Sequence, residues 1–124
     1  MESGVNTYKR VSVNTASKEQ ILLMLYEAAI KNCKIAMKAI EEKNIGKKGE
    51  YIGKFQDIVI ELNNSLDFSV NKEIASELSR LYDYLIFAST QANINVQKES
   101  LEDCLTIMNT LYSAWSQAIK SLKK

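Results

Sequence analysis

The chain contains no proline and only four glycines among its 124 residues. Strands and tight turns draw heavily on these two residue types, and proline breaks helix interiors, so their scarcity favours long helices. Apolar residues make up 46% and charged residues 25%, which is ordinary for a globular domain. A chain of this length can bury a core without disulfides or metals. We therefore expect a single all-α domain over residues 1–124.

Four stretches of the chain repeat apolar residues every three or four positions, the spacing of one helix face. They predict helices over about residues 17–43, 50–66, 72–93 and 98–123. Ser17 and Gln20 have capping-box spacing at the first helix start, and the segment from Asn44 to Gly49, with Gly46 inside it, is expected to interrupt the pattern before the second. Short connections then predict an antiparallel up-down four-helix bundle.

The third helix carries more apolar residues than one core-facing stripe needs. Its predicted core stripe is Ile74, Leu78, Leu81, Leu85, Ala88 and Ala92. At ~100° per residue, Ile86, Phe87 and Ile94 fall outside this stripe, and Tyr82 and Tyr84 lie on its flanks. Clustered apolar residues away from a core require a cover, which is either another segment of this chain or a second protein.

The first sixteen residues differ from the rest, because their apolar members, Val5, Tyr8, Val11 and Val13, follow no helical period. Two interpretations remain open for this segment. It is either a frayed end or an irregular strap packed on or near an apolar surface of the bundle.

Several classes of function are disfavoured by composition. The absence of histidine excludes most general-base triads and the usual metal sites, and no glycine-rich phosphate loop is present, so we expect no catalytic, cofactor-binding or metal-binding residues. A net charge of +1 argues against nucleic acid as a partner. No apolar run approaches the ~20 residues that cross a bilayer, which predicts a cytoplasmic protein without membrane insertion. Cys33 and Cys104 sit in apolar stripes and are expected to be core residues rather than a disulfide.

Short motifs in a fixed order along the chain resemble those of the flagellar secretion chaperones, the FliS family. They are Asn14-Thr15-Ala16-Ser17, Leu23-Met24-Leu25-Tyr26, Ser65-Leu66-Asp67-Phe68, Glu73-Ile74-Ala75, Leu78, Leu81-Tyr82-Asp83-Tyr84, Ala92-Asn93, Ala114-Trp115 and Ala118. Each motif alone is weak, but their order and spacing together are specific. Two departures stand out, since Phe87-Ala88 replaces a usual arginine pair and Gln97-Lys98 replaces a usual Asp-Pro.

The resemblance implies a bundle that binds the disordered C-terminal region of flagellin, prevents its premature polymerisation and delivers it to the flagellar type III export gate. It also implies that the first residues form a lid that helps to engage the export gate. The candidate partner-binding residues are Val5, Tyr8, Tyr82, Asp83, Tyr84, Ile86, Phe87, Asn93 and Ile94.

Two alternatives to this function remain open from the sequence. The outer apolar surface of the third helix is also consistent with a self-associating module that forms a weak homodimer. An adaptor that binds another disordered flagellar regulator through the same surface is equally compatible with these motifs.

Overall fold

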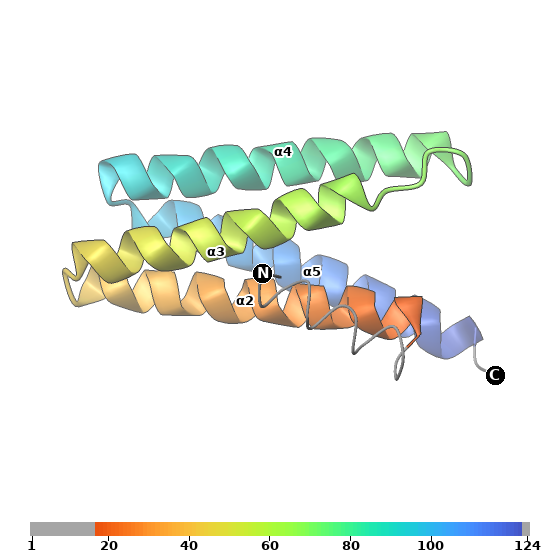
Figure 1. Cartoon of the computed structure of the whole chain (residues 1–124), viewed down its shortest axis with the longest axis horizontal. Helices are drawn as coiled ribbons and strands as arrows, with labels where there is room; N and C mark the ends of the chain where they lie inside the picture. The colour runs from red at the N-terminus through yellow and green to blue at the C-terminus, as the bar shows by residue number, and fades with distance from the viewer. Residues whose placement is uncertain (1–16, 123–124) are drawn as a thin grey trace, which may run out of the picture.

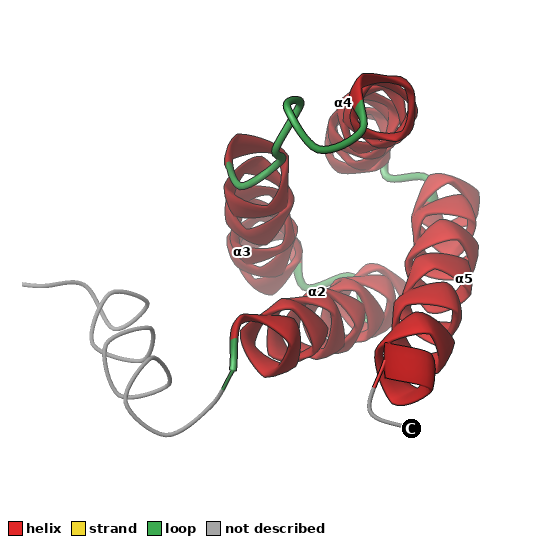
Figure 2. Cartoon of the chain, turned by 90° about the vertical axis from the view of Figure 1, so that its right-hand side faces the viewer, coloured by secondary structure: helices red, strands yellow, loops and turns green. Residues whose placement is uncertain are grey.

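A computed structural model describes residues 17–122 as four α-helices joined by short turns. These are α2 (Lys18–Glu41), α3 (Ile45–Asn64), α4 (Lys72–Asn95) and α5 (Lys98–Leu122). Each helix packs against its neighbours in the chain, and α5 returns to α2 to close the ring, as the end-on view in Figure 2 shows. The expected all-α antiparallel bundle is confirmed. The predicted strap, residues 1–16, lies outside the described residues.

Polar caps set where α2 and α3 begin. Ser17 Oγ accepts a hydrogen bond from Gln20 N, and Gln20 Oε1 accepts one from Ser17 N, each at 3.2 Å, so the predicted capping box is confirmed. The expected start of the second helix at residue 50 is wrong. Asn44 Oδ1 accepts from Lys47 N at 3.1 Å and starts α3 at Ile45, which places Gly46 and Gly49 inside the helix. This cap gives a hydrogen-bond partner to one of the backbone N–H groups that have none at the start of a helix. The stability gained helps to offset the ~1 kcal/mol of stability that each glycine inside a helix costs.

Helix α4 extends two residues beyond the predicted end at residue 93. Asn71 Oδ1 caps its start by accepting from Ile74 N at 3.1 Å. At its other end Val96 adopts a left-handed conformation with φ 52°, and its N–H donates to the carbonyl of Ala92. This residue turns the chain sharply into α5, which begins two residues later.

The core is apolar and draws on all four helices. Its fully enclosed large side chains include Tyr26, Phe55, Ile52, Leu62, Leu85, Leu101 and Met108. Cys33 and Cys104 are also buried as free thiols, as expected for small core residues. Trp115 is half-buried and packs against the edge of this core.

The predicted core stripe of α4 is only partly correct. Leu78, Leu85, Ala88 and Ala92 are buried, but Ile74 is 53% and Leu81 36% exposed. Ala75 and Tyr82 are buried in their place. In α5, Ala118 and Leu122 are exposed and Ile119 is buried.

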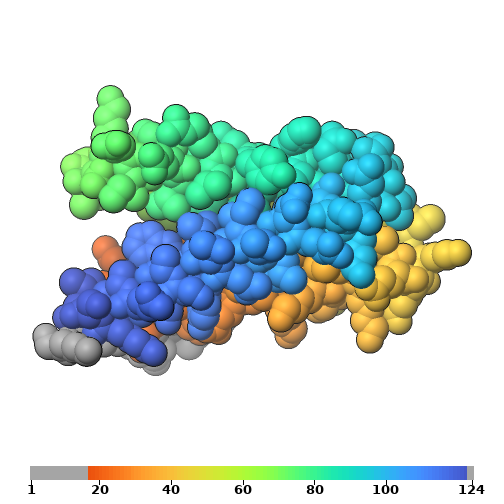
Figure 3. All heavy atoms as spheres, turned by 180° about the vertical axis from the view of Figure 1, so that it is seen from behind, coloured from red at the N-terminus to blue at the C-terminus, as the bar shows by residue number. Residues whose placement is uncertain are grey.

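The cause is the way in which α4 and α5 diverge. The two helices meet at the turn around residues 96–97 and separate toward the opposite end of the bundle, where α4 begins and α5 ends (Figures 1 and 3). We call the end with the 96–97 turn the closed end and the opposite end the open end. Side chains on the facing flanks of α4 and α5 are therefore buried near the closed end and uncovered near the open end.

Candidate partner-binding surface

The surface is hollowed between α4 and α5 toward the open end, as the space-filling view from behind shows (Figure 3). The flank of α5 that faces α4 is fixed by Cys104, whose Sγ lies 3.8 Å from the carbonyl oxygen of Leu85 on α4. Steps of three, four or seven residues from these two positions follow the same flanks toward the open end. They reach Ile74 and Leu81 on α4 and Leu111, Ala118 and Leu122 on α5. These residues, with Trp115, define what we call the α4–α5 groove.

The groove is apolar along both walls. Ile74, Leu81 and Leu122 are exposed large apolar residues, and Leu78 and Ile119 are almost covered beneath them. Contiguous apolar surface of this kind is typical of sites that receive another protein segment. The groove therefore has the character of a docking site for an amphipathic chain.

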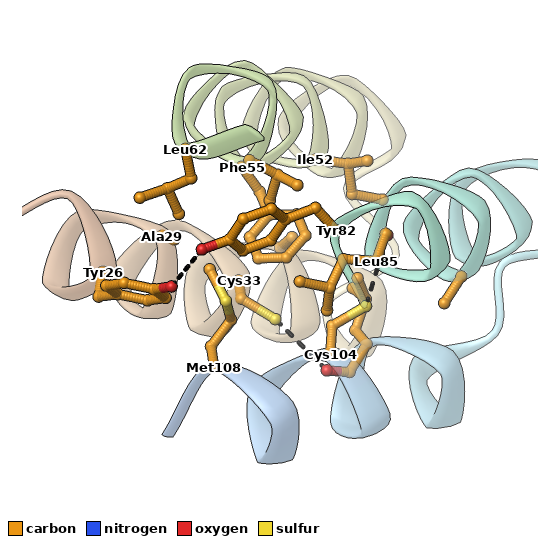
Figure 4. Close-up of a cluster of buried hydrophobic side chains, with 14 of the residues drawn as sticks. Tyr26, Ala29, Cys33, Ile52, Phe55, Leu62, Tyr82, Leu85, Cys104 and Met108 are labelled. Atoms are coloured by element: carbon orange, nitrogen blue, oxygen red, sulfur yellow. Dashed lines mark hydrogen bonds between the residues drawn. The ribbon is translucent and has the colours of Figure 1, made fainter. Parts of the chain in front are cut away.

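Aromatic side chains from three helices meet at the open-end side of the core. Trp115 Nε1 on α5 donates to the hydroxyl of Tyr26 on α2 at 3.2 Å. The Tyr26 hydroxyl also hydrogen-bonds to the hydroxyl of Tyr82 on α4 (Figure 4). Burial raises the pKa of both tyrosines, so both hydroxyls stay protonated at neutral pH. We call Tyr26, Tyr82 and Trp115 the aromatic trio.

A second exposed apolar surface lies on α4 away from the core. It consists of Tyr84, Phe87 and Ile94, which we call the outer face. Phe87 is 52% exposed, and Asp83 is exposed on the same helix. Ile86 is half-buried and packs against the core, and its carbonyl oxygen lies 3.4 Å from Gln56 Nε2 of α3.

Asn93 lies near the closed end, where its backbone carbonyl accepts a hydrogen bond from a lysine of α3. Lys48 Nζ donates to the carbonyl oxygen of Asn93 at 2.8 Å, and the Lys48 side chain is almost fully buried. The ammonium group thus satisfies a carbonyl in the last turn of α4 and complements the negative end of the helix dipole. Asn93 and Ile94 are separated from Leu81, the nearest groove residue of α4, by about half the length of that helix.

The structure does not bring all predicted site residues to one surface. Tyr84, Phe87 and Ile94 share the outer face, with Asp83 beside them. Tyr82, predicted on a flank of the stripe, is only 2% exposed and belongs to the core. Val5 and Tyr8 lie outside the described residues.

Ile74 and Leu81 were missed as candidate site residues because their spacing placed them in the core stripe. One signal was present in the sequence. The stripe carries the small residues Ala88 and Ala92 at one end and the large residues Ile74 and Leu81 at the other. A change in side-chain size along one stripe indicates a change in the distance to the neighbouring helix.

Fold and surface together define a class of protein, a helical bundle that offers apolar surface to another polypeptide. Over residues 17–122, no helix is both long and apolar enough to cross a membrane.

The pattern of the family described as flagellar protein FliS matches residues 1–122. The flagellar secretion chaperone FliS of Vibrio cholerae is 36% identical over 121 residues, covering 94% of this chain and 89% of the relative. The chaperone of the same name from Bacillus subtilis is 32% identical over 124 residues, covering 100% of this chain and 92% of the relative. A crystal structure of a bacterial flagellar chaperone superimposes with a TM-score of 0.79 at 15% identity, covering 96% of this chain and 99% of that one.

This chain belongs to the FliS family of flagellar secretion chaperones. The resemblance drawn from the motifs is thereby confirmed, and with it the role of an export chaperone for flagellin. Family membership also supports the expected non-enzymatic role and the expected place of action in the cytoplasm.

Proposed function

We propose that this chaperone holds the C-terminal segment of flagellin in the α4–α5 groove and across the outer face of α4. The observation that carries the proposal is the exposure of Ile74 and Leu81 on the flank of α4 that elsewhere forms the core. A helix-in-groove complex buries such a stripe against the apolar face of the bound helix. The outer face continues the apolar surface along α4, which suits a client longer than one helix.

Covering an assembly segment in this way explains how a chaperone prevents premature polymerisation. A segment that forms a filament by helix packing must expose apolar residues before it assembles. Because binding also orders a flexible segment, part of the interaction free energy is lost to conformational entropy. A large apolar surface, as formed by the groove and the outer face together, compensates for this loss.

Delivery to the export gate is the second half of the proposed function. Val5 and Tyr8 are our candidates for this contact, and the strap interpretation of residues 1–16 places them over an apolar surface until the client displaces them. The resemblance supports this role. Removal of residues 2–12 is expected to weaken binding to the export gate protein, and unchanged gate binding would overturn it.

Self-association is a second candidate function, and Phe87 is the observation that favours it. This exposed phenylalanine stands where the resemblance to the family implies an arginine, and it enlarges the apolar outer face. Two copies that pair through this face would form a symmetric contact. A mass that rises with protein concentration in sedimentation, and that falls to the monomer in Phe87→Arg, would establish it.

Calorimetry with flagellin of the same source tests the client proposal. The expected result is a one-to-one complex with a large negative heat-capacity change, lost when flagellin lacks its last ~40 residues, a length sufficient to span this bundle. Leu81→Asp should weaken binding at least tenfold, because it places a charge in an apolar groove at a cost of about 2 kcal/mol or more. Ile60→Asp, at an exposed isoleucine of α3, is the matched control and should bind as the unchanged protein does.

Equal binding by full-length and truncated flagellin would contradict the assigned client segment. Equal binding by Leu81→Asp and the unchanged protein would contradict the assigned groove.

A further inference from the structure

The side chains at the two ends of the bundle differ in size in a way that matches the divergence of α4 and α5. At the closed end the facing positions are filled by Ala88 and Ala92 of α4 and by Cys104 of α5, all buried. Small side chains allow two helix axes to approach closely. From the middle of α4 toward the open end, the hydrogen-bonded aromatic trio links α2, α4 and α5.

We propose that the aromatic trio is a wedge that holds the α4–α5 groove open. Tyr26, Tyr82 and Trp115 are positioning residues in this proposal, since they shape the groove from beneath rather than bind the client through their own polar groups. The inference rests on the proposed function for its consequence in client binding. Its geometric part concerns the free protein and stands apart from the identity of the client.

A wedge must be rigid, and the close packing of the enclosed rings supplies that rigidity. Tyrosine and tryptophan have only two side-chain torsions each, and the chain of bonds from Trp115 through Tyr26 to Tyr82 links α5, α2 and α4. Tyr26 and Tyr82 are fully or almost fully buried, so their rings are enclosed by the core. The three rings therefore act as a fixed spacer between helices that would otherwise close on each other.

The alternative to a wedge is that the turns between the helices alone determine how far α4 and α5 diverge. Only one turn, around residues 96–97, connects α4 directly to α5, and it lies at the closed end. No connection within the described residues joins the diverging ends of these two helices directly. Without a spacer, apolar residues such as Ile74 and Leu122 would gain burial by collapse of the groove. The open groove thus requires a filling element beneath it, and the aromatic trio occupies that position.

A distance measurement in the free protein tests the geometric part. Spin labels on Glu77→Cys of α4 and Gln117→Cys of α5 occupy exposed positions on the diverging helices. The native thiols Cys33 and Cys104 are buried and should remain unlabelled. In this background Tyr82→Leu should shorten the distance between the labels, because core sites partly collapse when a side chain is reduced. Tyr82→Phe keeps the ring and should leave the distance unchanged.

Client affinity measured on the same variants tests the functional part. Tyr82→Leu should weaken flagellin binding about tenfold, and Tyr82→Phe should remain within a factor of about three. Phe55→Leu, a reduction of a fully buried ring on α3, is the control for general loss of stability and should bind normally. An unchanged label distance in Tyr82→Leu, or equal weakening in Tyr82→Leu and Phe55→Leu, would overturn the wedge.

Failure of the proposed function gives a different pattern. In that case the unchanged protein does not bind flagellin at all, while the label distances still respond to Tyr82→Leu.

Discussion

Val96 ends α4 in a conformation that its side chain disfavours. Its φ is 52°, and left-handed backbone costs an L-residue roughly 1–2 kcal/mol because Cβ crowds the following carbonyl. Its side chain is half exposed, so little burial offsets this cost. We expect Val96→Gly to raise the free energy of unfolding by about 1 kcal/mol, measured by urea denaturation.

Val70→Gly is the matched control, because Val70 is an exposed valine without a positive φ. It should leave stability unchanged or slightly reduced, since glycine adds only freedom to the unfolded chain there. Equal effects of the two substitutions would contradict the strain assigned to Val96.

The two buried free thiols, Cys33 and Cys104, make the free energy of unfolding sensitive to alkaline pH. Burial raises the pKa of Cys33 and of Cys104 from 9.0 to about 12. A pKa that is higher in the folded state stabilises the fold below the unfolded pKa, and this stabilisation is lost as pH rises toward the folded value. We therefore expect the free energy of unfolding to decline from about pH 9 upward, as measured by urea titrations at several pH values.

A Cys33→Ala/Cys104→Ala double variant should show a shallower decline, because it lacks both titrating thiols. Ionisation of Tyr26, whose pKa burial also raises, contributes at still higher pH in both proteins. If the free energy of unfolding depended on pH identically in the double variant and the unchanged protein, titratable groups other than the two thiols would cause the decline.

At the scale of helices, Lys48 links the first turn of α3 to the last turn of α4. Its buried ammonium donates to the carbonyl oxygen of Asn93, and hydrogen bonds to charged groups contribute about 1.5–3 kcal/mol. Lys48→Met keeps the apolar stem and removes the donor, so we expect the free energy of unfolding to fall by about that amount. Thermal and urea unfolding both measure this change.

Lys47→Met is the control, since the neighbouring Lys47 is exposed and its substitution should change stability by less than about 0.5 kcal/mol. A comparable loss in both variants would show that charge at the start of α3 matters, rather than the bond to Asn93.

Sequence patterns did not predict the polar contacts between helices. Gln56 Nε2 lies 3.0 Å from Ser89 Oγ and 2.9 Å from Thr90 Oγ1, which joins α3 to α4. The periodic stripes located the helices and most buried apolar positions because those depend on spacing along one helix. Partners such as Lys48 with Asn93 depend on how two helices are placed, and one sequence does not specify that placement.

At the scale of the whole molecule, the fold and the family followed from the sequence, whereas the site followed only in part. Excess apolar surface on α4 was predicted, and the outer face with Phe87 matches it. The groove was not predicted, because the spacing of Ile74 and Leu81 assigned both residues to the core stripe. Divergence of α4 from α5 exposes Ile74 and Leu81 of the predicted core stripe. Side-chain size along the stripe indicates this divergence, whereas the spacing of apolar residues does not.

Hydrogen exchange with mass spectrometry, on the chaperone alone and with flagellin bound, tests the groove most directly. The bound client should slow exchange in the first half of α4 and the second half of α5, which together form the α4–α5 groove. The first turns of α3, at the closed end, should exchange as before. Slowed exchange confined to α2 and α3, with α4 and α5 unchanged, would contradict the assignment of the groove as the client site.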